Sequence, residues 1–169
     1  LTQIRSSFNY SSANRYVLED VSICNIKEFI YNSLNDYFNL VYQPASETSL
    51  RITQSWCNYA NKGDGHHKHY HSNSLVSGVF YLQTNDDDQI FFYKDLNYNL
   101  SIDAKHYNEY NSRSWSLPVK TGLLFLFPSD LDHSVDVVTG SDTRVSLSFN
   151  SFPVGTIGNY TNATELILS

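Results

Sequence analysis

The chain has 169 residues, of which 41% are hydrophobic and 15% aromatic, and a formal net charge of −6. These values predict a packed globular protein, and they exclude a basic surface for nucleic acid or for an anionic membrane. No run approaches the roughly 18 apolar residues of a membrane span. The two cysteines, Cys24 and Cys57, lack the spacing of a disulfide scaffold or a zinc finger, so a reducing, cytoplasmic location is expected.

The expected elements begin with one helix. A short strand is expected at Arg15–Leu18, and apolar residues at helical spacing then predict an amphipathic helix over Ile26–Asn39. Asn25 and Glu28 resemble a capping box at its start, and Pro44 ends it. We expect this helix to pack on a sheet.

Many short strands follow the helix. Apolar or alternating runs predict strands at Arg51–Cys57, Ser77–Gln83, Gln89–Tyr93, Ser114–Leu117, Leu123–Phe127, His133–Val138 and Thr143–Phe149, separated by turn-rich segments. This order is typical of a mainly β sandwich or jelly roll. The whole chain, 1–169, is expected to be a single domain, with helical support at about 20–40 and a β core at about 50–152.

Histidines mark the first candidate site. The segment 63–71 holds four of the six histidines. His69 and His71 are two residues apart, so on a strand they project to the same face. Imidazole suits Fe, Zn, Cu or Ni, and His133 could complete a facial set of ligands with open positions. Clustering alone would equally fit a solvated polar loop.

Arg144 supplies the second part of the pattern. On an extended strand Arg144, Ser146 and Ser148 share one face. A permanent cation beside two hydroxyls, near a metal, is suited to a small dicarboxylate co-substrate. The alternative is a surface ion pair of Arg144 with Asp136 or Asp142.

Taken together, these segments resemble the Fe(II)/2-oxoglutarate-dependent oxygenases, in particular a group of small members from bacteria and phages. The matching pieces are Ser55–Asn58, His69–His71, Ser77–Leu82, Gly122–Ser129, His133–Val135 and Arg144–Asn150. The resemblance implies a double-stranded β-helix, a jelly roll related to the cupins, whose major and minor sheets enclose the metal.

The resemblance also implies roles for particular residues. His69 and His133 would bind iron, and Arg144 would hold the distal carboxylate of 2-oxoglutarate, with Ser146 beside it. Tyr81 would reach the same carboxylate, and Asn58 would line the pocket. The implied activity is that of a hydroxylase-type dioxygenase using Fe(II), 2-oxoglutarate and O₂. Its substrate would be a prolyl or peptidyl residue or a small molecule, with no nucleic-acid or membrane partner.

His71 departs from the family pattern. Most of these oxygenases carry Asp or Glu at this position, and a neutral ligand leaves the iron site one charge more positive. We favour His71 as the third ligand; the alternative is that it faces the substrate while water completes the coordination. Asp64 is the weaker candidate for a replacement carboxylate. Metal binding is expected to weaken as the histidines protonate below about pH 6.

Two other functions fit the same architecture. A three-histidine cupin-type dioxygenase would bind iron without 2-oxoglutarate, but Leu75 and Val76 stand where the first cupin motif has its glutamate. A catalytically degenerate jelly-roll binding module is the third possibility. Arg144 distinguishes the 2-oxoglutarate-dependent oxygenase from the cupin-type dioxygenase, because an arginine at this position has no standard role in a cupin. Asp95–Ser114 would be either a lid over the cleft or a solvated excursion.

Overall fold

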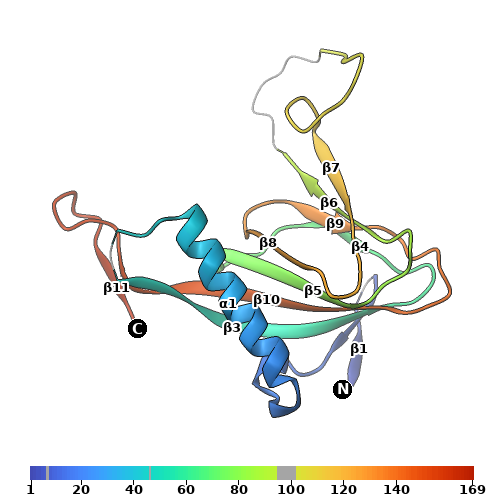
Figure 1. The fold of residues 1–169 in the computed structure, drawn as a ribbon, viewed down its shortest axis with the longest axis horizontal. Helices are drawn as coiled ribbons and strands as arrows, with labels where there is room; N and C mark the ends of the chain where they lie inside the picture. The colour runs from blue at the N-terminus through green and yellow to red at the C-terminus, as the bar shows by residue number, and fades with distance from the viewer. Residues whose placement is uncertain (7, 46, 95–101) are drawn as a thin grey trace.

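The structure is a computed structural model, which describes residues 1–169 except 7, 46 and 95–101. Its described part contains one α-helix, two 3-10 helices and eleven strands (Figure 1). The helices are η1 (Val17–Glu19), η2 (Val21–Ile23) and α1 (Cys24–Val41). The strands are β1 (Gln3–Arg5), β2 (Tyr10–Ser12), β3 (Thr48–Ala60), β4 (His66–His69), β5 (Val76–Gln83), β6 (Gln89–Tyr93), β7 (Ser114–Pro118), β8 (Leu124–Pro128), β9 (His133–Val135), β10 (Arg144–Ile157) and β11 (Leu166–Leu168).

The strands form two antiparallel sheets. The larger has the order β1-β2-β3-β10-β5-β8, with β11 also pairing with β10, and the smaller has the order β4-β9-β6-β7. The long strands β3 and β10 pair over most of their length, so β10 lies at the centre of the larger sheet. The expected mainly β, jelly-roll architecture is confirmed.

Helix α1 packs on the larger sheet, as expected (Figure 1). Ile30, Leu34 and Phe38 are buried along one face of the helix and contact side chains of β3, β5 and β10. The expected capping box is wrong, because Asn25 lies inside the helix and Ile23 is its N-cap. The start is instead formed by η2, where the Asp20 side chain accepts a hydrogen bond from the backbone N–H of Ser22.

A second core cluster fills the space between the two sheets. It contains Val79, Tyr81, Ile90, Val119 and Phe127, from β5, β6, β8 and the segment after β7. These residues alternate with those that face α1, since successive side chains of a strand point to opposite faces. The metal-centre residues described below lie beside this cluster.

The remaining differences from the expected elements lie at the ends of the chain and around the histidines. The strand expected at Arg15–Leu18 is wrong: Tyr16 makes an isolated bridge with Ser55, and Val17–Glu19 is a 3-10 helix. Strands β1, β2, β4 and β11 were not expected. Strand β4 escapes pattern recognition because its sequence, His-His-Lys-His, has no alternation of apolar and polar residues.

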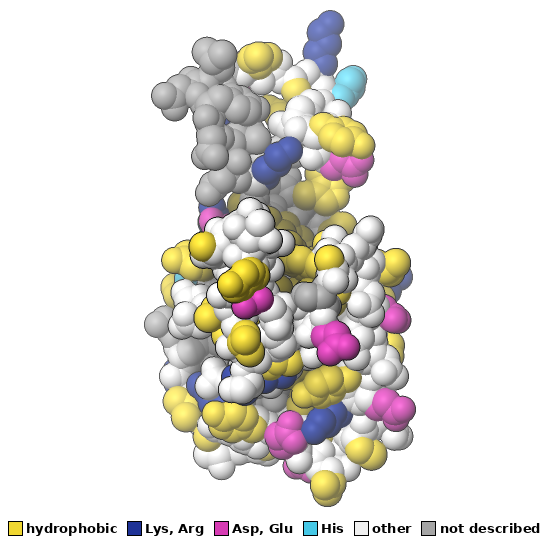
Figure 2. All heavy atoms as spheres, turned by 90° about the vertical axis from the view of Figure 1, so that its left-hand side faces the viewer, with side chains coloured by type: hydrophobic (Ala, Val, Ile, Leu, Met, Phe, Trp, Pro, Cys, Tyr) yellow, Lys and Arg dark blue, Asp and Glu magenta, His cyan; other side chains and the backbone are white. Residues whose placement is uncertain are grey.

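Four further observations bear on the sequence expectations. Cys24 is exposed and Cys57 is buried, and no disulfide joins cysteines in the described part of the chain. None of the described helices is long and apolar enough to cross a membrane. On the face shown in Figure 2, acidic and basic side chains are scattered without a continuous basic patch. Of the expected lid or excursion, 95–101 lie outside the described residues, and Ile102, Tyr107 and Tyr110 are exposed.

Candidate metal centre

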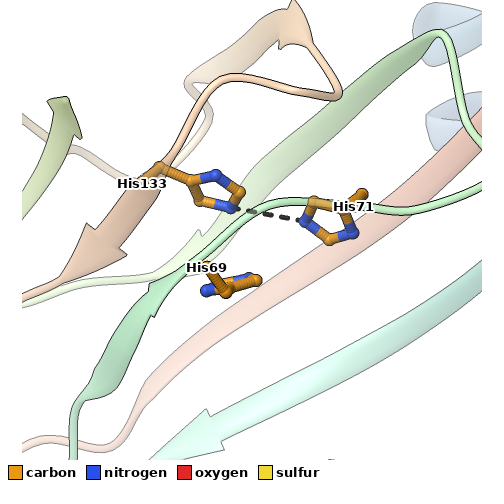
Figure 3. A group of neighbouring side chains, drawn as sticks. All are labelled: His69, His71 and His133. Atoms are coloured by element: carbon orange, nitrogen blue, oxygen red, sulfur yellow. Dashed lines mark hydrogen bonds between the residues drawn. The ribbon is translucent and has the colours of Figure 1, made fainter. Parts of the chain in front are cut away.

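Three histidine side chains converge between the sheets. One ring nitrogen of each of His69, His71 and His133 lies within 4.8 Å of the others, and the rings point toward one another (Figure 3). His69 and His133 are direct partners across the β4–β9 pair. His71 follows the end of β4 and is fixed by its backbone N–H, which donates to the carbonyl of Ser129 at 2.8 Å.

The hydrogen bonds of two of these rings indicate which nitrogen faces the centre. Nδ1 of His69 lies 2.8 Å from the carbonyl oxygen of His67, and Nδ1 of His133 lies 3.0 Å from that of Leu131. A carbonyl only accepts hydrogen bonds, so each Nδ1 carries the proton. Each Nε2 then presents its lone pair to the centre, as in metal-binding histidines oriented by a backbone carbonyl.

The spacing of the nitrogens fits a shared metal ion. Nε2 of His71 and Nε2 of His133 are 3.3 Å apart. Two nitrogens that bind one ion at right angles, each about 2.1 Å from it, are about 3.0 Å apart. Three neutral imidazoles are also a donor set that first-row metals such as iron accept. The residues present therefore fit the iron that the sequence pattern implies.

Burial keeps these imidazoles neutral. Desolvation, followed by repulsion from neighbouring histidines, lowers the pKa of His71 to about 3. Desolvation likewise lowers the pKa of His133 to about 4, and it lowers the pKa of His69 against the opposing effect of the His67 carbonyl. These lowered pKa values favour the neutral, metal-binding form of the three imidazoles at neutral pH. The expectation that metal binding weakens below about pH 6 stays a prediction.

The cavity beside the histidines is lined by the residues expected to bind 2-oxoglutarate. Tyr81, Ser146 and Asn58 are direct partners across β5, β10 and β3, so they form one row on the inner face of the larger sheet. Arg144 lies two residues before Ser146 and lines the same cavity. This cavity has a volume of about 50 Å³.

Tyr81 contains an unsatisfied polar atom. Its side chain is 1% exposed, and its hydroxyl has no hydrogen-bond partner among the described residues. Burial raises the pKa of this hydroxyl, and the positive charge of Arg144 partly opposes the rise. A buried hydroxyl without a partner costs free energy. A ligand that accepts a hydrogen bond at this position would remove that cost.

Arg144 is buried, and its ion pair differs from the one considered at the sequence level. Its Nη1 donates to Asp88 Oδ1 at 2.8 Å, and its Nη2 donates to the backbone carbonyl of Asp136 at 3.0 Å. Both charged side chains are almost inaccessible, with exposures of 5% for Arg144 and 2% for Asp88. Neither Asp136 nor Asp142 forms a side-chain ion pair with Arg144 in the described structure.

Sequence reasoning missed several residues of the site. Asp88 lies in one of the turn-rich segments between the expected strands, and no local pattern links it to Arg144, 56 residues later. His66 lines the cavity and stacks on His69 with ring centroids 4.3 Å apart, and Trp56 also lines it. Asp64 is a turn residue paired with Arg5, and this removes it as a substitute ligand.

Fold and site thus describe a jelly-roll protein in which three histidines could hold a metal ion. Residues 54–150, more than half of the chain, match the family described as "Putative 2OG-Fe(II) oxygenase". The chain belongs to this family of 2-oxoglutarate- and Fe(II)-dependent oxygenases. A search among curated proteins gave no match.

Two solved structures illustrate the similarity in fold. An oxidoreductase of the 2OG-Fe(II) oxygenase family from Burkholderia pseudomallei is 15% identical, with a TM-score of 0.59, covering 89% of this chain and 71% of that one. HygX from Streptomyces hygroscopicus, solved with nickel and 2-oxoglutarate, is 12% identical, with a TM-score of 0.56, covering 89% of this chain and 73% of that one. At these identities the likeness concerns the fold alone.

Proposed function

We propose that this protein is an Fe(II)- and 2-oxoglutarate-dependent dioxygenase of the hydroxylase type. The observation that carries the proposal is one cavity containing three convergent histidine nitrogens, a buried arginine and a buried tyrosine hydroxyl without a partner. His69, His71 and His133 would hold the iron. Arg144 and Tyr81 would hold the distal carboxylate of 2-oxoglutarate, and Ser146 and Asn58 would line its binding site.

The charges of the cavity favour a dianionic co-substrate. Asp88 cancels the charge of Arg144, and the three imidazoles are neutral. A divalent ion would therefore leave two positive charges, which 2-oxoglutarate matches with two negative ones. In the usual family pattern a carboxylate ligand on the metal provides the anion. Here Asp88 supplies a negative charge through its ion pair with Arg144, which compensates for the neutral ligand His71.

The residues of the chain act by binding and positioning. Bound iron, with 2-oxoglutarate and O₂, supplies the oxidation: the co-substrate becomes succinate and CO₂ as one oxygen atom enters the substrate. The neutral histidines are ready to bind the metal without losing protons. Val79, Ile90 and Phe127 line the cavity with apolar surface and exclude water from the reacting groups.

A three-histidine dioxygenase that does not use 2-oxoglutarate is the second candidate. One observation favours it: the guanidinium of Arg144 already has a buried carboxylate partner, Asp88, so part of its charge is neutralised. An arginine has five N–H donors, however, and two are engaged in these contacts. The remaining donors are sufficient for a second carboxylate.

The test is an anaerobic titration of the apo-protein with Fe(II) and then 2-oxoglutarate, monitored by the visible charge-transfer band of the chelated complex. We expect the band in the wild type. Tyr81→Phe should weaken 2-oxoglutarate binding by about tenfold, the usual effect of losing a hydrogen bond to a charged group. Tyr59→Phe, on β3 but packed on the α1 side of the sheet, is the matched control and should bind normally.

The role of Arg144 in binding 2-oxoglutarate is tested with a variant that leaves no buried charge uncompensated. The double variant Arg144→Gln/Asp88→Asn removes both members of the ion pair, and it should bind iron normally but 2-oxoglutarate much more weakly. Tight iron binding without a band in the wild type would favour the three-histidine dioxygenase. Failure to bind iron would leave a binding module.

A further inference from the structure

A second cavity opens beside the metal centre. This cavity, here called the vestibule, has a volume of about 200 Å³ and lies between the N-terminal segment, β3 and β4. Asn9, Trp56, Asn58 and His66 line both the vestibule and the metal cavity, so the two spaces are contiguous. A molecule seated in the vestibule would have one end beside the three histidines.

The vestibule lies on the inner face of the larger sheet. Trp56 and Asn58 alternate along β3 with Cys57, which packs on the α1 side. Ser11 of β2 lies directly opposite Asn58 and also lines the vestibule. Strand β2 therefore extends the inner face of the larger sheet on the side of β3 away from β10, and the vestibule lies over this part of the sheet.

A larger hollow of about 470 Å³ lies nearby but is a poorer substrate site. Phe91 and Tyr93 line it, and they alternate along β6 with Ile90 and Phe92, which face the core between the sheets. The hollow therefore lies mainly on the outer face of the smaller sheet, although His66 and Val135 line both it and the metal cavity. Its cations are already paired, since Arg5 contacts Asp64 and Lys68 contacts Asp132.

The vestibule by contrast presents hydrogen-bond donors without a carboxylate partner. No Asp or Glu is among its lining residues in the described chain, although the protein as a whole carries a net charge of −6. Arg15 is partly buried, and its guanidinium donates to the hydroxyl of Ser11 at 3.2 Å. None of the ion pairs in the described structure involves Arg15.

Asn9 adds a second oriented donor. Its side chain is 4% exposed, and its Oδ1 accepts a hydrogen bond from the hydroxyl of Ser6. Because the amide oxygen is engaged, the amide N–H₂ is the group left for a ligand. A guanidinium and an amide N–H₂ on the wall of one cavity suit an anionic group, because charge-assisted hydrogen bonds to such groups are the strongest available.

We propose that the vestibule binds the primary substrate by an acidic group, and that the substrate is a small carboxylic acid held by Arg15 and Asn9 with its reacting carbon toward the histidines. The proposal rests on the function proposed above. The size of the cavity supports a small molecule, because pockets for larger, drug-sized ligands begin at about 300 Å³. Arg15 and Asn9 also lie outside 54–150, the part matched by the family, so this selectivity belongs to the chain's own N-terminal segment.

The test measures binding to the protein loaded with Zn(II) in place of iron, with saturating 2-oxoglutarate, so that no turnover occurs. The probes are a set of N-acetyl amino acids, each compared by NMR titration with its uncharged amide, and inorganic phosphate. We expect at least one acid to bind more tightly than its amide. Arg15→Gln should weaken binding of the acid by about tenfold and leave the amide unchanged. Arg51→Gln, exposed elsewhere on β3, is the matched control.

Each outcome bears on the proposal. Equal binding of acids and amides, or no effect of Arg15→Gln, would overturn it, and so would saturable phosphate binding that excludes the acids. If 2-oxoglutarate itself fails to bind, the proposed function has failed; the acid and amide comparison is then repeated with Zn(II) alone. A preference for acids that depends on Arg15 in that experiment would still support an acid-binding vestibule.

Discussion

His71 stands where the family pattern described above has a carboxylate. Its ring nitrogen lies 3.3 Å from that of His133, and its backbone is anchored to Ser129. The structure therefore brings His71 to the other two histidines although β4 ends at His69. This geometry favours a metal-binding role for His71 over a role facing the substrate.

We predict that His71→Ala weakens metal binding by more than the 10- to 100-fold that is typical when a residue merely supporting a ligand is lost. The measurement is a competition titration of Zn(II) or Fe(II) against a chelator of known affinity. His66→Ala is the control, because His66 stacks on His69 but is not part of the convergent group. Similar losses in the two variants would show that His71 is not a ligand.

Asp88 gives a second prediction at the residue scale. Asp88→Asn would leave the charge of Arg144 buried and uncompensated, and breaking such a pair usually costs about 3–5 kcal/mol of stability. Because 2-oxoglutarate is itself an anion, it should stabilise the variant more than it stabilises the wild type. Thermal unfolding of both proteins with and without 2-oxoglutarate and Zn(II) measures this difference. Equal stabilisation would place the co-substrate away from Arg144.

At the scale of secondary-structure elements, the sequence predicted the helix and the strands whose positions hydrophobic periodicity determines. The central strands and the helix on the sheet were predictable because Ile30, Leu34, Phe149 and their neighbours follow the periods of a helix or a strand. Strand β4 was missed because its polar residues lie at the edge of the smaller sheet. The histidines and Arg144 were recognisable by their spacing. Asp88 reaches Arg144, and Arg15 reaches the vestibule, only through tertiary folding.

Helix α1 and the metal centre lie on opposite faces of the larger sheet, so they can be perturbed separately. Leu34 is fully buried against that sheet. Leu34→Ala should lower the free energy of unfolding by about 2–5 kcal/mol, through lost burial and the cavity left behind. Metal affinity measured in the folded protein should be unchanged. A parallel loss of metal affinity would indicate that helix packing and the histidine geometry are coupled.

For the whole molecule, burying a cluster of neutral histidines makes stability depend on pH. The pKa of His66 is lowered to about 3 by burial and by repulsion from the neighbouring histidines. His66 is therefore a fourth buried histidine with a lowered pKa, beside the three of the metal centre. In the unfolded chain each imidazole titrates near its usual pKa of about 6.5. Between these values the unfolded state binds protons that the folded state does not.

This difference in proton uptake determines how the stability of the folded state changes with pH. A group whose folded pKa is lowered in this way destabilises the folded state as the pH falls below about 6.5, and its effect is complete below the folded pKa. We predict that the metal-free protein loses stability steeply between pH 7 and pH 5, where carboxylates with ordinary pKa values near 4 contribute little. Urea unfolding at several pH values in this window measures the loss. His66→Phe, which keeps a ring against His69 but does not titrate, should reduce the slope by about the effect of one proton. Stability that stays constant from pH 7 to pH 5 would mean that these histidines are not buried in solution.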